Sequence, residues 1–352
     1  MEFLFEYGLF LAKIATAVVA IVGILIVIKS LKGGHGDKGE LEITDLNKKH
    51  RDTVEQLEHH LFDKAMLKAR EKEEKKRDKK KNKELETEAK KAAKTGEIKP
   101  SREPRTFVLD FNGSIDAREV GALREEISAI LAVAVAGDEV LLRLESGGGM
   151  VHGYGLASSQ LDRLKTAGIR LTIAVDKVAA SGGYMMACVA DNIVAAPFAI
   201  IGSIGVVAQL PNFNKLLKKN NIEFEQLTAG EFKRTLTMFG ENTDKAREKF
   251  QEELEETHVL FKDFIADHRP KLVLETVATG EHWFGQQALK LGLIDKIATS
   301  DDLVMEACKD REVLAVKYVR RKSLQDKLSG SAADAADNLL LKWMSRGQRP
   351  FM

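Results

Sequence analysis

Residues 139–151, EVLLRLESGGGMV, run from an apolar stretch into three consecutive glycines. The apolar part has the length and composition of a buried β-strand. Glycines let the following loop turn its backbone N–H groups toward a ligand, either a phosphate or the oxyanion of a tetrahedral intermediate. The loop has the spacing of neither a Walker A loop nor a dinucleotide-binding loop. Taken alone, it is explained equally well by a plain tight turn.

Strand and helix patterns alternate on both sides of this stretch. Strands are predicted at 107–111 and 171–175, and helices at 118–133 and 154–166. Strands that alternate with helices are typical of βαβ units with a largely parallel sheet. The sequence therefore predicts an α/β domain that begins near residue 106.

Residues 193–210 form an apolar run that could be read as a membrane span. Pro197, Gly202 and Gly205 interrupt the run, and β-branched residues are frequent in it. Two buried strands joined by a turn fit this composition better.

Residues 178–187, VAASGGYMMA, surround one serine with small residues at the start of a predicted helix. A serine there is ordinarily a helix N-cap. The small neighbours, however, keep the Ser181 hydroxyl uncrowded, and a helix N-terminus favours developing negative charge. The amide of Gly182 is then a natural oxyanion donor, and that of Gly148 can supply the second.

A nucleophilic serine needs a base to take its proton. No histidine occurs between residues 153 and 257, and no carboxylate is placed to orient His152. Residues 230–235, GEFKRT, put Lys233 behind a glycine and beside an aromatic residue. A single lysine is normally a surface residue, but desolvation by apolar walls favours the neutral amine that a base requires. Ser181 and Lys233 are thus the candidate nucleophile and general base.

These motifs resemble those of the signal peptide peptidase A/SohB family of Ser-Lys peptidases in the ClpP/crotonase superfamily. Residues 180–184 are similar to the nucleophile motif, residues 230–233 to the lysine motif, and residues 201–206 to the segment whose serine binds the lysine. Residues 280–295 resemble the closing helix-and-strand signature. The likeness runs from about 106 to 297. One departure is Gly147, which stands where the family usually has proline.

The resemblance implies a ClpP/crotonase-like fold of repeated βαβ units and a serine endopeptidase that works through an acyl-enzyme. Ser181 would be the nucleophile and Lys233 the base, with Ser203 orienting Lys233 and Gly148 and Gly182 forming the oxyanion hole. It further implies a homo-oligomeric ring that acts on peptide or protein substrates associated with the membrane, including spent signal peptides. No cofactor is expected. A non-catalytic membrane scaffold and a crotonase-like acyl-CoA enzyme are the alternatives.

Residues 8–28 are almost entirely apolar and long enough to cross a membrane as a helix. A cleavable signal peptide is the alternative, but acidic residues precede the run and the run is long for a signal peptide. We therefore expect a single-pass anchor that contacts lipid in a bacterial plasma (inner) membrane. Basic residues after the run place the bulk of the chain on the cytoplasmic side. The better-known relatives act on the opposite side, so the side remains open.

The chain of 352 residues carries a net charge of +1, but residues 48–105 have a surplus of basic residues. The predicted parts of the whole chain are an anchor at 1–32, a charged helical or disordered spacer at 33–105, a peptidase domain at 106–322 and an amphipathic tail at 323–352. Residues 41–69 show helical spacing within the spacer. The charged run at 70–99 contains no aromatic residues to stack on bases, so nucleic-acid binding is not expected. Two cysteines without partners at metal-ligand spacing predict neither a disulfide framework nor a metal site.

Overall fold

The computed structural model describes residues 39–63, 66, 67, 72, 76, 79, 83, 87, 104–230 and 232–319. The predicted anchor at 8–28 and tail at 323–352 lie outside these residues. Among the helices in the described ranges, none is both long and apolar enough to cross a membrane.

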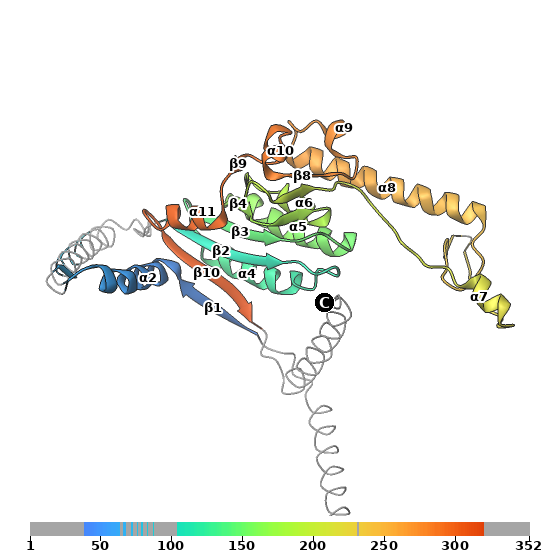
Figure 1. Ribbon diagram of the computed structural model, residues 1–352, viewed down its shortest axis with the longest axis horizontal. Helices are drawn as coiled ribbons and strands as arrows, with labels where there is room; N and C mark the ends of the chain where they lie inside the picture. Colours follow the sequence, from blue (N-terminus) through green and yellow to red (C-terminus); the bar gives the residue numbers. More distant parts are fainter. Residues whose placement is uncertain are drawn as a thin grey trace, which may run out of the picture. The chain divides into compact units, whose positions relative to one another are not determined.

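The main sheet has seven strands in the order β1-β10-β2-β3-β4-β6-β9 (Figure 1). The strands are β1 (Glu40–Asp45), β2 (Arg105–Asn112), β3 (Glu139–Glu145), β4 (Arg170–Val175), β6 (Asn192–Ala195), β9 (Lys296–Ile297) and β10 (Glu312–Val319). From β10 to β9, every neighbouring pair is parallel. The predicted α/β class with a largely parallel sheet is therefore confirmed.

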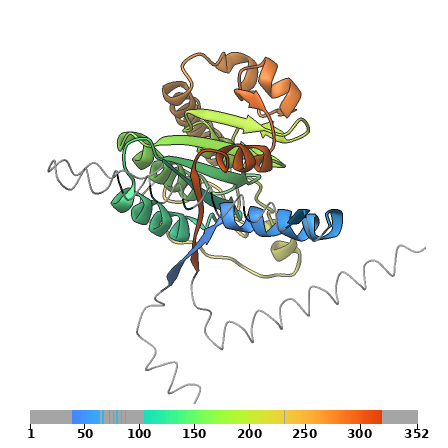
Figure 2. The ribbon, with the colours of Figure 1, turned by 90° about the vertical axis from the view of Figure 1, so that its left-hand side faces the viewer.

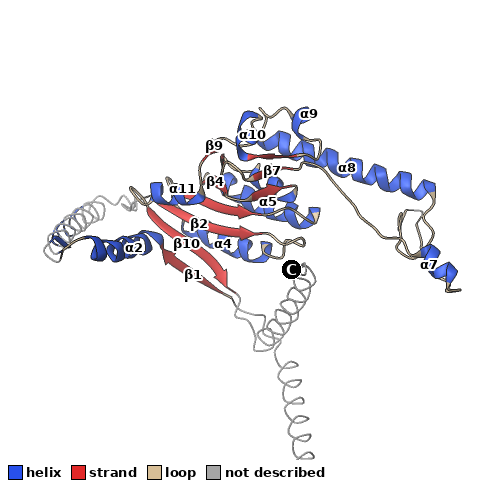
Figure 3. Cartoon of the chain, in the orientation of Figure 1, coloured by secondary structure: helices blue, strands red, loops and turns tan. Residues whose placement is uncertain are grey.

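Alternate residues of each strand face opposite sides of this sheet, as the two-residue period of a strand requires. Phe107 and Leu109 of β2 enter the larger core, which includes buried residues of three helices before residue 190 and of three helices after residue 240. The first three are α4 (Val120–Val133), α5 (Val151–Thr166) and α6 (Gly182–Ala187). Val108 and Leu141 instead face a smaller cluster beneath α11 (Ser300–Ala307) and the start of α2 (Leu46–Leu61). Figures 2 and 3 show the strands flanked by these helices.

A second, smaller sheet contains β5 (Val178–Ala180), β7 (Ile200–Gly202) and β8 (His282–Phe284) in that order. Ser146, directly after β3, is bridged to this sheet: its N–H donates to the Val178 carbonyl at 2.9 Å. The Ala180 N–H in turn donates to the Ser146 carbonyl at 3.0 Å. The glycine loop after β3 is thereby fixed against the strand that leads to Ser181.

The apolar run at 193–210 forms β6 and β7, which confirms buried strands in its first part. After β7 the chain continues through an exposed segment and α7 (Asn214–Lys219) to α8 (Asp244–His268). The remaining elements are α9 (Leu274–Val277) and α10 (Gly285–Lys290).

The segment predicted as a charged spacer also contributes to the fold. Helical spacing was predicted from residue 41, but Glu40–Asp45 is extended and forms the edge strand β1, so the helix α2 begins only at Leu46. The Asn47 side chain joins this region to the end of the domain. Its Nδ2 donates to the carbonyls of Cys308 and Arg311, and its Oδ1 accepts from the Val313 N–H at 2.7 Å.

Candidate active site

Ser181 occupies a sharp turn between β5 and α6. Its φ is 52° and its ψ is −119°, a conformation that residues with a side chain seldom adopt. The turn is held at both backbone groups. The Ser181 N–H donates to the Gly202 carbonyl at 2.8 Å, and the Ser181 carbonyl accepts from the Met185 N–H at 3.0 Å. The helix predicted after this serine is confirmed as α6.

The two glycines after Ser181 are required by close packing. A Cβ on Gly182 would lie 2.4 Å from the Tyr154 ring, and one on Gly183 would lie 2.4 Å from the Ser146 carbonyl oxygen. Both distances are far inside van der Waals contact, so any larger residue would push α6 away from α5 and the glycine loop.

Gly148 lies directly against the nucleophile turn. Its φ of +85° favours glycine, and a Cβ there would lie 2.6 Å from the Gly182 nitrogen and 2.8 Å from the Ser181 Cβ. The structure therefore brings Gly148, Ser181 and Gly182 together.

The backbone of Ser203 lies close to the Ser181 turn, but the hydrogen bonds of Ser203 go to other residues. It follows Gly202, the register partner of Ala180 in the β5–β7 pair. The Ser203 hydroxyl donates to the Gly280 carbonyl at 3.3 Å, and its N–H donates to the Glu281 carbonyl at 2.7 Å. The predicted contact with Lys233 is not made within this chain.

Lys233 is exposed, and within the described part of the chain its amine makes no hydrogen bond or ion pair. The ring of the preceding residue, Phe232, lies 5.7 Å from the Lys245 amine and 5.8 Å from the Lys249 amine, both near the start of α8. The buried residues of α8 are Phe261 and Ile265, in its second half. From Lys249 to Phe261 the helix rises about 18 Å. The structure thus does not bring Lys233 to Ser181 of the same chain.

Residues 203–243, which we term the arm, have a small apolar cluster of their own. The Phe239 ring lies 6.1 Å from that of Phe213 and 5.7 Å from that of Phe224. Asn212 ties the two ends of the arm together, since its Nδ2 donates to the carbonyls of Thr237 and Gly240. Several large apolar side chains of the arm are nevertheless exposed: Val207, Leu216, Ile222, Leu227 and Phe232.

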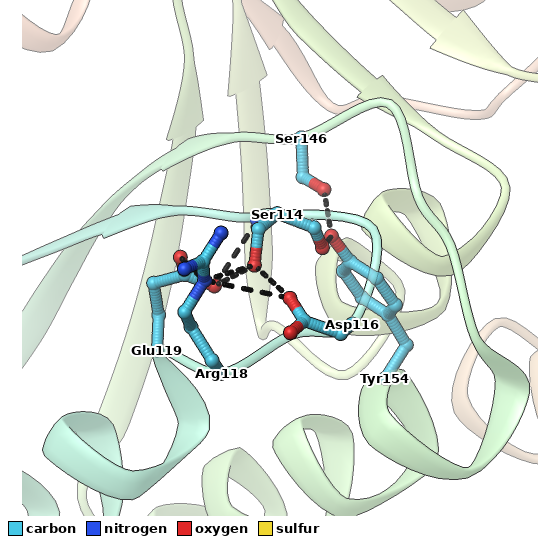
Figure 4. Close-up of polar contacts among 6 residues, drawn as sticks. All are labelled: Ser114, Asp116, Arg118, Glu119, Ser146 and Tyr154. Atoms are coloured by element: carbon cyan, nitrogen blue, oxygen red, sulfur yellow. Dashed lines mark hydrogen bonds and ion pairs between the residues drawn. The ribbon is translucent and has the colours of Figure 1, made fainter. Parts of the chain in front are cut away.

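One set of contacts beside Gly148 was not predicted from the sequence. The Tyr154 hydroxyl lies 2.5 Å from the Ser146 hydroxyl and donates to the Ser114 carbonyl at 2.8 Å (Figure 4). The Gly148 N–H donates to the Ser146 hydroxyl at 3.1 Å. The sequence signal was weak: a serine and a tyrosine on either side of the glycine loop are ordinary residues without a motif.

Neither cysteine is part of this cluster. Cys188 is fully buried in the core beside α6, as the apolar run around it predicts, and burial raises the pKa of its thiol. Cys308 is half-buried and caps α11. Among the described residues, no group of three His, Cys, Asp or Glu side chains is placed to hold a metal ion.

Comparison with known proteins gives the family. Residues 2–161 match Peptidase family S49 N-terminal, and residues 163–314 match Peptidase family S49. A Haemophilus influenzae protein named "Probable protease SohB" is 53% identical over 352 residues, covering 100% of this chain and 99% of that protein. Its namesake from Buchnera aphidicola subsp. Acyrthosiphon pisum is 59% identical over 242 residues, 69% of this chain and 72% of that protein.

Among solved structures, one similar chain is a mutant of a membrane-bound stomatin-specific protease in complex with a substrate peptide. It aligns with a TM-score of 0.40 and 16% identity, over 66% of this chain and 99% of that chain. The full-length likeness to a protein named "Probable protease SohB", together with the two family matches, shows that this chain belongs to peptidase family S49 and is a protease.

Proposed function

We propose that the protein is a serine endopeptidase of ClpP/crotonase-like fold in which Ser181 is the nucleophile and Lys233 the general base. The observation that supports this most is the close contact of Ser181, in its strained backbone conformation, with the backbones of Gly148 and Gly182. A strained serine flanked by two glycine amides is suited to acyl transfer.

The reaction begins when the Ser181 oxygen attacks the scissile carbonyl and its proton passes to the neutral Lys233 amine. The amides of Gly148 and Gly182 stabilise the oxyanion, for which the Gly148 N–H must turn from the Ser146 hydroxyl to which it donates in the substrate-free chain. One such donor is typically worth about 3 kcal/mol of barrier. Lys233 then gives its proton to the leaving nitrogen as the C–N bond breaks. A water molecule, deprotonated by Lys233, hydrolyses the acyl-enzyme and restores the serine.

Lys233 reaches a serine in this proposal by joining the site of a neighbouring copy. Within one chain, the lysine lies beside the start of α8, whereas the buried part of that helix is about 18 Å further along. The exposed apolar side chains of the arm would be covered when two copies pack together. A head-to-tail contact gives a ring when its rotation closes, and the expected homo-oligomer would be such a ring. In that assembly Ser203 would meet the incoming Lys233.

We further propose that the protein is held in a bacterial plasma membrane by residues 8–28 and cuts membrane-associated polypeptides, signal-peptide remnants included. The support is the length and apolar composition of that segment. Reporter fusions that are active on one side of the membrane only, placed at the C-terminus, would establish which side carries the catalytic domain.

The dyad is tested with the full-length chain, its Ser181→Ala and Lys233→Ala variants, and membrane peptides as substrates. Both variants should lose turnover while keeping the circular dichroism and melting curve of the wild type. A fluorophosphonate should label Ser181 in the wild type only. Retained cleavage in either variant would exclude the dyad, and labelling without any peptide cleavage would favour another acyl-transfer reaction.

A further inference from the structure

Three aromatic rings, those of Phe198, His282 and Phe284, form a row on the outer face of the second sheet, which we term the aromatic row. His282 and Phe284 are alternate residues of β8, so their side chains lie on the same face of the strand. The centre of the Phe284 ring lies 6.1 Å from that of Phe198 and 6.5 Å from that of His282. Trp283, between them in the strand, packs instead against the larger core. The aromatic row therefore faces away from the core.

The aromatic row is uncovered in a single chain. Phe198 is 82% exposed and Phe284 is 44% exposed, and His282 is exposed as well. One exposed apolar side chain is ordinary, but adjacent exposed aromatic rings are typical of a surface that binds a partner. The row is therefore a candidate interaction surface.

The aromatic row is also held in place by backbone contacts. Phe198 lies in the short connection between β6 and β7, where the Pro197 carbonyl accepts a hydrogen bond from the Gln286 N–H at 3.1 Å. A Cβ on Gly285 would lie 2.1 Å from the Ala196 carbonyl oxygen, so this connection and the start of α10 are in direct backbone contact. A surface that is already fixed loses little conformational entropy when a partner covers it.

One end of the aromatic row lies beside the Ser181 turn. His282 is the register partner of Gly202, and the Gly202 carbonyl accepts a hydrogen bond from the Ser181 N–H at 2.8 Å. Two residues of a strand span about 7 Å, so Phe284 is the next step away along β8. A partner that covers the row would therefore also lie beside Ser181 and Ser203.

The arm of a second copy has the properties that such a partner needs. Its exposed apolar side chains include Leu227, which is 95% exposed, and Phe232, which is 45% exposed. Phe232 directly precedes Lys233, and in the proposed function Lys233 reaches Ser203 of a neighbouring copy. The apolar residues around that lysine would then lie over the surface next to Ser203, and the aromatic row provides an apolar surface at that place.

We propose that the aromatic row is the docking surface for the arm of a second copy of this chain. This inference rests on the proposed function, because that function requires the lysine to come from a neighbour. The contact removes two exposed apolar surfaces from water, which stabilises the assembly. It also brings Lys233 to a fixed position beside Ser181 of the next copy.

Photo-crosslinking identifies what covers the aromatic row. Phe198 and, as a control, the exposed Met305 of α11 are each replaced by p-benzoylphenylalanine in the full-length chain in detergent. After illumination, the chain with the probe at 198 should give a covalent dimer, and mass spectrometry should map the link to residues 203–243 of the second chain. The probe at 305 should give no link to these residues.

A second experiment measures the energetic role of the aromatic row. We expect Phe198→Ser to raise the dissociation constant between copies by about tenfold or more, measured by sedimentation velocity. Peptide turnover should fall at concentrations below that constant and recover above it, since the variant keeps every group of the proposed dyad. Met305→Ser, which also removes an exposed apolar side chain, should match the wild type in both measurements. Unchanged melting curves show that both variants fold.

Several results would overturn the inference: no covalent dimer, or a link from residue 198 to the peptide substrate, to detergent or to residues outside the arm. Unchanged assembly in Phe198→Ser, or an equal change in Met305→Ser, would do the same. The proposed function fails differently, since it would fail if Ser181→Ala or Lys233→Ala still cleaved peptides, whatever covers the aromatic row.

Discussion

At the residue scale, Asp295 fixes the C-terminal end of α8 to the rest of the domain, which we term the body. Its carboxylate accepts two hydrogen bonds of 2.8 Å from Arg269, the residue that caps α8, and one of 2.7 Å from the Ile193 N–H. Burial alone would raise the pKa of Asp295, but the hydrogen bonds from Arg269 and Ile193 outweigh it and hold the pKa below its ordinary value of 3.8. The charged form is therefore favoured by folding.

Replacing Asp295 by asparagine should reduce the free energy of unfolding at pH 7 by about 2 kcal/mol, the typical worth of hydrogen bonds to a charged group. Because the pKa is lowered in the folded state, this stabilisation is complete above 3.8 and is lost as the pH falls through the lower folded value. Denaturant unfolding of both proteins from pH 7 to pH 2.5 measures it. Asp267→Asn, at an exposed site on the same helix, should change stability by less than about 0.5 kcal/mol. A difference that stays constant down to the lowest pH would contradict the assignment.

At the scale of elements, the sequence predicted what depends on local pattern. The helices α4 and α5 and the strands β2 to β4 follow from their own periodicity and composition, and Ser181 precedes a helix as its sequence neighbours predict. β1 was missed because all six of its residues are exposed and its place is set by β10, which lies far away in the sequence. A strand defined by a distant partner has no local signal.

Asn47 should stabilise the packing of the β1–α2 segment against β10. Asn47→Ala removes one acceptor and two donated hydrogen bonds, and it leaves the Val313 N–H in β10 without its partner. We expect a loss of about 1–3 kcal/mol in the free energy of unfolding and faster proteolysis within residues 40–61. The control is Thr53→Ala on the same helix, whose hydroxyl bonds only to the Lys49 carbonyl at an exposed site. Equal stability of the two variants would show that α2 is not part of the cooperative unit.

At the scale of the whole molecule, the candidate site is divided between the body and the arm. The sequence predicted Ser181, Gly148 and Gly182 as neighbours, and they are, because all three flank strands that are bridged to one another. It also predicted Lys233 as their partner. No sequence pattern states which copy of a chain supplies a residue, and the structure leaves this lysine exposed beside the start of α8.

Mixed oligomers test whether Ser181 and Lys233 of one site come from two different chains. Ser181→Ala and Lys233→Ala chains, each inactive alone, should regain activity when co-expressed, because a site between two chains can combine an intact serine with an intact lysine. With equal amounts and random assembly, about a quarter of the sites are complete. Peptide turnover by the purified mixture, with mass spectrometry to confirm that both chains are present, measures this. If the dyad formed within each chain, the mixture would be as inactive as its components.

The position of Lys233 on the arm has a further consequence for how such a protease is prevented from cleaving the proteins around it. A newly synthesised chain would already have the reactive serine and its glycine amides, yet it would lack a base and so could not attack the proteins around it. Dilution alone would return the enzyme to this dormant condition. If the dyad forms between two chains, as proposed, cutting would begin only where enough chains have gathered.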